Sequence, residues 1–231
     1  MSTLTSVWSL VAAFDATLAG IVALSLRVSL TATLIATLLG APLGAALAIW
    51  RFPGRRLLLL IASTLMALPP VVAGLFVYLM LSRAGPLGDL GLLFTPTAMI
   101  VAQTLLIFPI LVALTHQAVV PLMRDYRDLL ASTGAGGLLT LRTLMWDARF
   151  AMITAVLAGF GRAIAEVGAV LIVGGNIAGV TRVMTTTIAL ETSKGNLELA
   201  LALGVVLLTL ALAVNVAMQL LGRLGRRFET P

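Results

Sequence analysis

The chain has 231 residues, of which 60% are hydrophobic and only 10% are charged, with a mean hydropathy of +1.12 and a formal net charge of +6. Soluble globular domains have about half apolar and about a quarter charged residues, so this composition excludes an ordinary soluble protein. The absence of cysteine excludes disulfides, thiolate metal sites and cysteine nucleophiles. Together these features predict an all-α polytopic membrane protein.

Five apolar stretches are long enough to cross a bilayer, which takes about 20 residues for about 30 Å of hydrocarbon. They cover residues 16–50, 57–82, 96–120, 150–175 and 197–222. The first exceeds one crossing, but no turn signal divides it, so it predicts one long helix that begins in the outer interface. No soluble domain, linker or internal repeat is visible, and residues 1–231 are therefore predicted to form a single membrane domain.

Proline and glycine separate and bend these stretches. Phe52-Pro53-Gly54 lies between the first two, and the pair Pro69-Pro70 lies inside the second. A proline within a helix frees a backbone carbonyl, which a membrane protein tolerates only against protein or a water-filled cavity. The pair therefore predicts either a wall of a pathway or a simple packing kink. The spacing of Gly40 and Gly44 predicts close helix packing.

The positive charges are distributed unevenly about the stretches. Ten lie on one predicted side: Arg51, Arg55, Arg56, Arg124, Arg127, Arg142, Arg149, Arg223, Arg226 and Arg227. Three lie on the other: Arg83, Arg182 and Lys194. The positive-inside rule then predicts an extracytoplasmic N-terminus and a cytoplasmic C-terminus. No basic region precedes the first apolar residues, so no cleavable signal peptide is expected. The charge indicates topology, not nucleic-acid binding.

The interval 121–149 is polar and rich in arginine, and it lies between the third and fourth stretches. Asp125 and Asp128 come early in it, an apolar run follows, and Gly134 comes next. Acids favour a helix N-terminus, and a glycine favours a left-handed C-cap, so the pattern predicts a short helix that ends at this glycine. The interval is either a solvated hairpin or a docking element for a soluble partner.

Two charges fall inside the fourth stretch. Arg162 and Glu166 are four residues apart and should share one helix face. Ionised groups at that depth are costly, so they face a bundle interior, an aqueous route or each other. The pair is either a self-neutralising contact or part of a gate in a transport pathway.

The predicted outer segment between the last two stretches offers several hydrogen-bond donors, and its part from Val183 to Thr192 predicts a short helix that re-enters the membrane. The donors are Asn176, Thr181, Arg182, Thr185, Thr186 and Thr187. They would suit an anion that must be passed along without being trapped, or they contact a protein that delivers it.

The chain has few residues that could take part in catalysis or bind a metal. The single histidine, His116, is predicted at a helix end, and no metal site is expected. The single lysine, Lys194, is not preceded by a phosphate-binding loop, so no nucleotide is hydrolysed by this chain and no cofactor is predicted. Energy for uphill work would come from another subunit or from an ion gradient.

The interval 128–147 resembles the cytoplasmic loop of permease subunits of binding-protein-dependent ABC importers, which carries E-A-A, three residues, G and then an apolar residue ten positions on. Here Asp128 takes the glutamate position, Leu129 and Leu130 the alanine positions, Gly134 the glycine and Leu144 the apolar position, while Trp146-Asp147 replaces the terminal L-P. SLRVSL, FPGRR and ALPPVVAG are similar to molybdate- and tungstate-type permeases. The second half, AEVGAVLIVGGNIAGVTRVMTTTIALETSKGN, is most similar to the tungstate branch.

The resemblance implies a type I importer fold and a homodimer in a bacterial or archaeal cytoplasmic membrane. It also implies two cytoplasmic ATPase subunits carrying ATP and Mg²⁺, and an extracytoplasmic protein that delivers tungstate first and molybdate second. The ATPase would contact Asp128, Leu129, Leu130, Ala131, Gly134 and Ala135. No soluble regulatory domain is expected. The alternatives are an ion-coupled secondary transporter or channel and, last, an intramembrane hydrolase.

Overall fold

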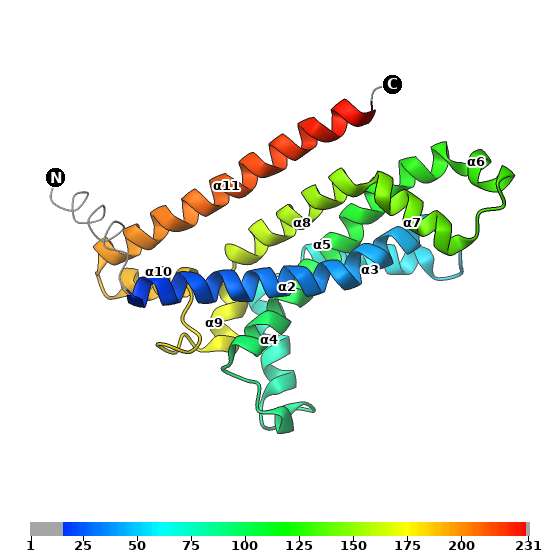
Figure 1. The fold of residues 1–231 in the computed structure, drawn as a ribbon. Helices are drawn as coiled ribbons and strands as arrows, with labels where there is room; N and C mark the ends of the chain where they lie inside the picture. The colour runs from blue at the N-terminus through cyan, green and yellow to red at the C-terminus, as the bar shows by residue number, and fades with distance from the viewer. Residues whose placement is uncertain (1–15, 230–231) are drawn as a thin grey trace. The chain divides into compact units, whose positions relative to one another are not determined.

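The computed structural model describes residues 16–229, with side chains described from Thr17 to Arg223. Its described part is built from α-helices and one 3-10 turn (Figure 1). The elements are α2 (Ala16–Ile49), α3 (Arg55–Met66), α4 (Pro70–Leu81), η1 (Gly88–Leu90), α5 (Pro96–Asp125), α6 (Arg127–Ser132), α7 (Gly137–Asp147), α8 (Arg149–Ile164), α9 (Gly168–Gly174), α10 (Met184–Ser193) and α11 (Leu197–Glu229). The prediction for the N-terminus falls on residues outside the described range. The side chains of Arg226 and Arg227, which were counted in the predicted charge distribution, also lie outside the described part.

Three of these helices are long and apolar enough to cross a membrane alone: Thr17–Ile49, Pro96–Asp125 and Leu197–Arg223. Two further pairs, α3 with α4 and α7 with α8, pass the same test only together and are bent between their members. The described residues therefore hold three candidate spans, or up to five if each bent pair crosses once. The prediction of an all-α polytopic membrane protein is confirmed.

The second predicted stretch is broken at its proline pair. Helix α3 ends at Met66, Pro69 is the N-cap of α4, and Pro70 is its first residue. Proline is favoured there because the first N–H groups of a helix have no intrahelical acceptor. The predicted bend at this pair is confirmed.

The fourth stretch, 150–175, was predicted to form one helix, but the structure divides it into two. Helix α8 ends at Ile164 and α9 begins only at Gly168, so three residues interrupt the stretch. Moreover, α8 forms its bent pair with α7, at an angle of 72°, across Ala148. The physical reason lies in the hydrogen bonds of Glu166, which are described with the site below.

The chain divides into two compact units. Unit 1 takes in Met1–Ala32, Pro69–Thr104 and Gly161–Ala213, and unit 2 takes in Thr33–Leu68, Leu105–Phe160 and Val214–Pro231. Each is considered by itself below, within the residues that the structure describes.

Unit 1 is centred on the tight packing of α4 against α9, which lie side by side (Figure 1). A Cβ atom on Gly74 would come within 2.7 Å of the Cα of Ala169, so only glycine permits this approach. Tyr78 of α4 meets the Phe94 ring edge-on at 6.3 Å between centroids, and the backbone N–H of Phe94 donates to the carbonyl of Val173.

Unit 2 is held by the close approach of α2 and α5. A Cβ atom on Gly44 would lie 2.4 Å from the carbonyl oxygen of Val112, and one on Gly40 would lie 3.1 Å from that of Phe108. The close packing predicted from the glycine spacing is therefore confirmed. A second core, formed by Ala45, Val119, Leu144 and Ala148, attaches α7 to the same helices.

Candidate functional site

The predicted docking element lies in unit 2. Helix α5 continues through Pro121 and ends at Asp125, so Asp125 does not begin the short helix as predicted. That helix is α6, and Asp128 lies in its first turn. The turn after α6 leads into α7, which contributes Leu144 to the core of unit 2 (Figure 1). The polar interval is thus two helices and a turn, anchored at its second helix.

Helix α6 ends as its glycine predicts. Gly134 has a φ of 63° and donates its N–H to the carbonyl of Ala131, while the N–H of Ala135 donates to that of Leu130 at 3.0 Å. These two bonds define a Schellman motif, in which a left-handed residue satisfies the last carbonyls of the helix. No heavy atom lies within 4 Å of a Cβ built on Gly134, so its conformation, and not crowding, requires glycine.

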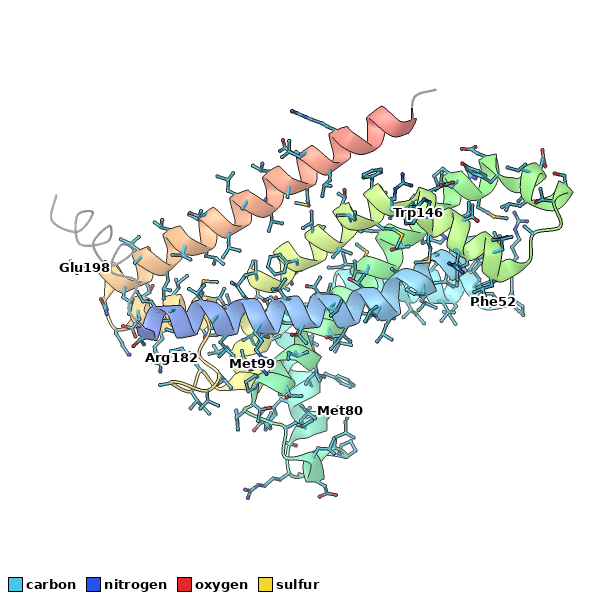
Figure 2. The ribbon with its side chains drawn as sticks, in the orientation of Figure 1. Phe52, Met80, Met99, Trp146, Arg182 and Glu198 are labelled. Atoms are coloured by element: carbon cyan, nitrogen blue, oxygen red, sulfur yellow. The ribbon has the colours of Figure 1, made fainter. Side chains whose placement is uncertain are left out.

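The same element exposes large apolar side chains. Leu129 is 56% exposed, Leu138 71%, Leu139 60% and Trp146 69%. Of the remaining predicted contact residues, Asp128, Ala131 and Gly134 are exposed, while Leu130 and Ala135 are half-buried. Figure 2 shows Trp146 on α7, where the guanidinium of Arg149 lies 5.1 Å from its ring centroid. Leu129 lies on α6 and the other three side chains lie on α7, and exposed apolar side chains on two neighbouring helices are typical of a docking surface.

Two contacts fix this element to unit 2. The side chain of Tyr126, just before α6, forms a hydrogen bond with Asp147 at the end of α7, and this bond and the charge raise the pKa of the phenol. Gly137, at the start of α7, packs so closely on the indole of Trp50 that a Cβ there would lie 3.1 Å from Nε1. The first contact joins the start of α6 to the end of α7, and the second holds the start of α7 against Trp50.

The second group of predicted residues surrounds the interruption between α8 and α9 in unit 1. Arg162 Nη1 lies 2.5 Å from Glu166 Oε2, and the side chains are 39% and 3% exposed. Glu166 Oε1 accepts the N–H of Ala169 at 3.1 Å, and the carbonyl of Glu166 accepts Thr185 Oγ1–H at 2.8 Å. Glu166 thus follows α8 and accepts an N–H of α9, so the predicted contact with Arg162 is present, but it forms across the end of α8 and not along one continuous helix.

A small polar cavity of about 10 Å³ adjoins this carboxylate, about the lower limit for one water molecule. The amide nitrogen of Gln103 donates to the carbonyl of Ala163 at 3.0 Å, while its buried Oε1 has no hydrogen-bond partner. The cavity is lined by Ser25, Val28, Ser29, Gln103, Ile164, Glu166, Val183 and Thr185. Glu166 and Thr185 were predicted as site residues; the polar residues Ser25, Ser29 and Gln103 were not. An amide inside an apolar stretch is the signal that could have identified Gln103.

The helix predicted at Val183–Thr192 is present as α10, but most of the donors predicted for an anion are engaged within the chain. Thr181 and Thr185 donate to the carbonyls of Gly174 and Glu166, and both are buried. Thr186 and Thr187 donate to the carbonyl of Val183. The expectation of a row of threonine donors open to a passing anion is therefore wrong.

Asn176 and Arg182 come together on the segment between α9 and α10, where Figure 2 labels Arg182. Arg182 Nη2 donates to the carbonyl of Asn176 at 3.4 Å, and Asn176 Nδ2 donates to that of Thr186. Pro69 is exposed and Pro70 half-buried, and neither lines the cavity at Glu166. The predicted pathway residues are therefore not one cluster. Within the described residues no group of three or more metal-ligating side chains meets.

Comparison with known proteins identifies the family. The family described as "binding-protein-dependent transport system inner membrane component" matches residues 40–227. A probable anion ABC transporter permease protein of Haloferax volcanii is 46% identical over 92% of this chain and 90% of its own length. A tungstate uptake system permease protein of Peptoclostridium acidaminophilum is 42% identical, over 89% and 90% respectively. A sulfate transport system permease protein of Salmonella typhimurium is 30% identical, over 77% and 67%.

The exposed, glycine-capped α6, the apolar helices and these similarities agree with one another. The chain belongs to the membrane-spanning permease subunits of binding-protein-dependent ABC importers, of the tungstate and anion type, and has their all-α type I fold.

Proposed function

We propose that this chain forms the translocation pathway for a tetrahedral oxyanion, with tungstate first, molybdate second and sulfate third. The order rests on the similarity of the chain to a tungstate uptake permease at 42% identity and to a sulfate permease at 30%. The proposal includes a homodimer, two cytoplasmic ATPase subunits and an extracytoplasmic delivery protein. ATP and Mg²⁺ would be bound by the ATPase and not by this chain.

The observation that carries the proposal is the exposed α6 with its Schellman cap. A short helix with an apolar tip and a fixed end can enter a groove on a partner. Asp128 lies at its N-terminal turn and Leu129 is more than half exposed, so both polar and apolar contacts are available. The contacts of Tyr126 and Gly137 tie this element to unit 2, so a force applied at α6 is transmitted to the helices around it.

Transport would follow from two states of the dimer. Closure of the ATPase pair on ATP would draw the two α6 helices together and open the pathway outward, and hydrolysis would return it inward. The interruption at Glu166 is our candidate for the gate, because Glu166 joins α8 and α9 through its carboxylate and α10 through its backbone carbonyl. A single displacement could therefore reach three helices.

The experiment that tests this function measures uptake of tungstate, molybdate and sulfate by metal or radiolabel analysis in cells with the full transporter. A strain lacking only this chain is the control. We expect tungsten to accumulate over the control and excess molybdate to compete more strongly than excess sulfate. If molybdenum accumulates and tungsten does not, the order of cargoes is wrong.

The same cells distinguish the class of transporter. Inactivating the ATPase subunit should abolish accumulation, and the ATPase should copurify with this chain. Accumulation that persists without the ATPase but is lost when the ion gradient is collapsed would instead establish an ion-coupled secondary transporter. Failure of both measurements would reject transport by this chain.

A further inference from the structure

A second hollow lies within unit 2, at the end that carries α6, and it is strongly basic. Its volume is about 160 Å³, space for about five water molecules. Four arginines from three helices and the intervening turn share its wall with four apolar side chains. The lining residues are Ala48, Ile49, Arg51, Arg55, Val120, Met123, Arg124 and Arg127.

No acidic side chain in the described part of the chain forms an ion pair with the arginines of this hollow. Among the described residues the only ion pairs are Arg162 with Glu166 and Lys194 with Glu191, and neither involves a lining arginine. The sequence neighbours Asp125 and Asp128 do not line the hollow. Arg51, Arg124 and Arg127 are exposed and Arg55 is half-buried, so solvent screens part of the repulsion among these four like charges, and a bound anion would relieve the rest.

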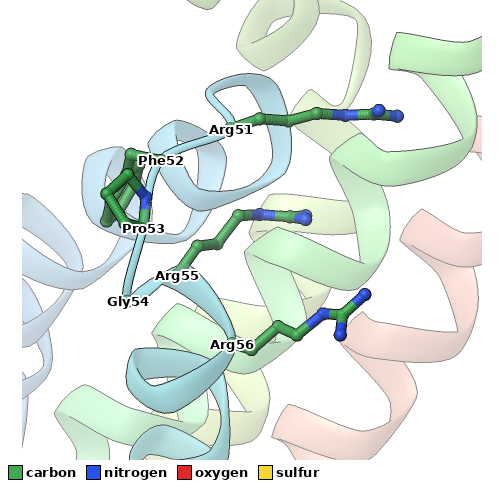
Figure 3. A pocket seen from close by; sticks show the side chains of 6 residues that line it. All are labelled: Arg51, Phe52, Pro53, Gly54, Arg55 and Arg56. Atoms are coloured by element: carbon green, nitrogen blue, oxygen red, sulfur yellow. The ribbon is translucent and has the colours of Figure 1, made fainter.

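One of the arginines is fixed in place. Arg55 donates from Nε to the carbonyl of Leu47 near the end of α2, and its Nη2 lies 3.2 Å from His116 Nε2. Figure 3 shows the side chains of Arg51, Arg55 and Arg56 extending to the same side of the chain, away from Phe52 and Pro53. The broader hollow along that turn is lined by residues 51–56 alone, whereas the basic hollow also takes arginines from α5 and α6.

We propose that this hollow binds a tetrahedral oxyanion group, with the guanidinium groups of Arg51, Arg124 and Arg127 around it and Arg55 as the fixed wall. Guanidinium matches the paired oxygens of phosphate and related oxyanions and is less strongly hydrated than ammonium. Two sources have this chemistry: the phosphate of an anionic phospholipid, and a free oxyanion in solution. The apolar wall and the exposed Trp50 beside Arg51 are compatible with a headgroup at the membrane interface.

The test uses the assembled transporter in nanodiscs. In the lipid arm, discs of phosphatidylcholine with and without phosphatidylglycerol are compared, and retained lipid is counted by native mass spectrometry. In the solution arm, inorganic phosphate and then tungstate are titrated into phosphatidylcholine discs at constant ionic strength, and the melting temperature is followed. Binding in either arm should weaken about tenfold or more in the double variant Arg124→Gln with Arg127→Gln, since each lost charge-assisted hydrogen bond is a strong one.

The matched control is Arg56→Gln with Arg142→Gln, which removes two exposed arginines of unit 2 that do not line the basic hollow. If the double variant Arg124→Gln with Arg127→Gln disturbs assembly, the single variant Arg51→Gln tests the same hollow, because Arg51 is exposed and lies outside α5 and α6. Retention of phosphatidylglycerol that only the hollow variants lose identifies a lipid, and a selective loss of phosphate or tungstate binding identifies a free oxyanion. Absence of binding in both arms, or equal losses in the control, overturns the proposal.

Discussion

Arg162 and Glu166 join two helices across the point where one ends and the next begins. Arg162, in the last turn of α8, pairs with one carboxylate oxygen at 2.5 Å, and the other oxygen accepts the N–H of Ala169 in the first turn of α9. The side chain of Glu166 is 97% buried, whereas that of Arg162 is 39% exposed. The two residues therefore contribute unequally to the stability of this junction.

Removing Arg162 should cost more stability than removing the pair. Arg162→Met leaves the buried carboxylate of Glu166 without its cation, whereas Arg162→Met with Glu166→Met leaves no charge behind. Because Arg162 is more than a third exposed, solvent screens the pair, and we expect the single change to cost about 1–3 kcal/mol. Thermal unfolding of the assembled complex measures both; a double variant less stable than Arg162→Met would contradict the expectation.

Glu166→Gln separates stability from gating, because an amide oxygen can still accept the N–H of Ala169. We expect this variant to assemble with its ATPase but to transport poorly or to leak. A stable and fully active Glu166→Gln transporter would show that the carboxylate is structural and that the gate lies elsewhere.

Gly134→Val should uncouple the permease from its ATPase. A β-branched residue in the left-handed conformation costs about 1–2 kcal/mol, so the Schellman motif that ends α6 should give way. We expect a folded dimer with reduced ATPase association or reduced stimulation of hydrolysis by the delivery protein. Gly134→Asn is the matched control, since asparagine tolerates this conformation and nothing crowds the position. Equal coupling in both variants would make the glycine dispensable.

Single cysteines test the predicted orientation directly, because the natural chain contains none. Ser193 at the end of α10 and Ser132 at the end of α6 are both exposed in the structure. In intact cells Ser193→Cys should react with an impermeant thiol reagent and Ser132→Cys should not, while both should react after lysis. The reverse pattern would place α6 outside and remove the basis for its contact with a cytoplasmic ATPase.

Local chemistry made some parts of this structure predictable from sequence. The cap at Gly134 and the bend at Pro69-Pro70 depend on backbone conformations that one residue type favours, and hydropathy over about 20 residues identifies spans. The break at 165–167 contains neither glycine nor proline and arises from the bonds of Glu166 with Ala169 and Thr185. The cavity at Gln103 also unites residues far apart in sequence, and no local pattern encodes such a grouping.

Gly74→Ala should destabilise unit 1. Its methyl group would come within 2.7 Å of the backbone of Ala169, which cannot move aside as a flexible side chain could, so we expect a loss of about 1–3 kcal/mol. Gly20→Ala is the control, because no atom lies near its Cβ position and alanine favours a helix by about 1 kcal/mol. Melting temperatures of the two variants should therefore shift in opposite directions; equal shifts would contradict the packing argument.

The end of α10 should lose stability in acid through Glu191. Hydrogen bonds from Lys194 and Asn196 lower the pKa of this carboxyl below its ordinary value of 4.5. A carboxyl whose pKa is lower in the folded state stabilises the fold above the unfolded pKa, and this contribution is lost as the pH falls through the folded pKa. The melting temperature should therefore fall less between about pH 6 and about pH 3 in Glu191→Gln than in the natural chain. Parallel curves would show that Glu191 does not contribute to this pH dependence.

The contact of Gly74 with Ala169 also limits how unit 1 can move. At Gly74 the backbones of α4 and α9 touch, so the two helices cannot slide past one another at this point without lifting apart. We therefore expect α4 and α9 to move together as one rigid pair. The connection to α3 at 67–69 is short, non-helical and largely exposed, so its backbone torsions can change at little cost in packing, whereas the connection to α8 at 165–167 holds the buried and hydrogen-bonded Glu166. Bending at this end of unit 1 is therefore expected at residues 67–69, and sliding of α4 along α9 is opposed by the absence of one methyl group at Gly74.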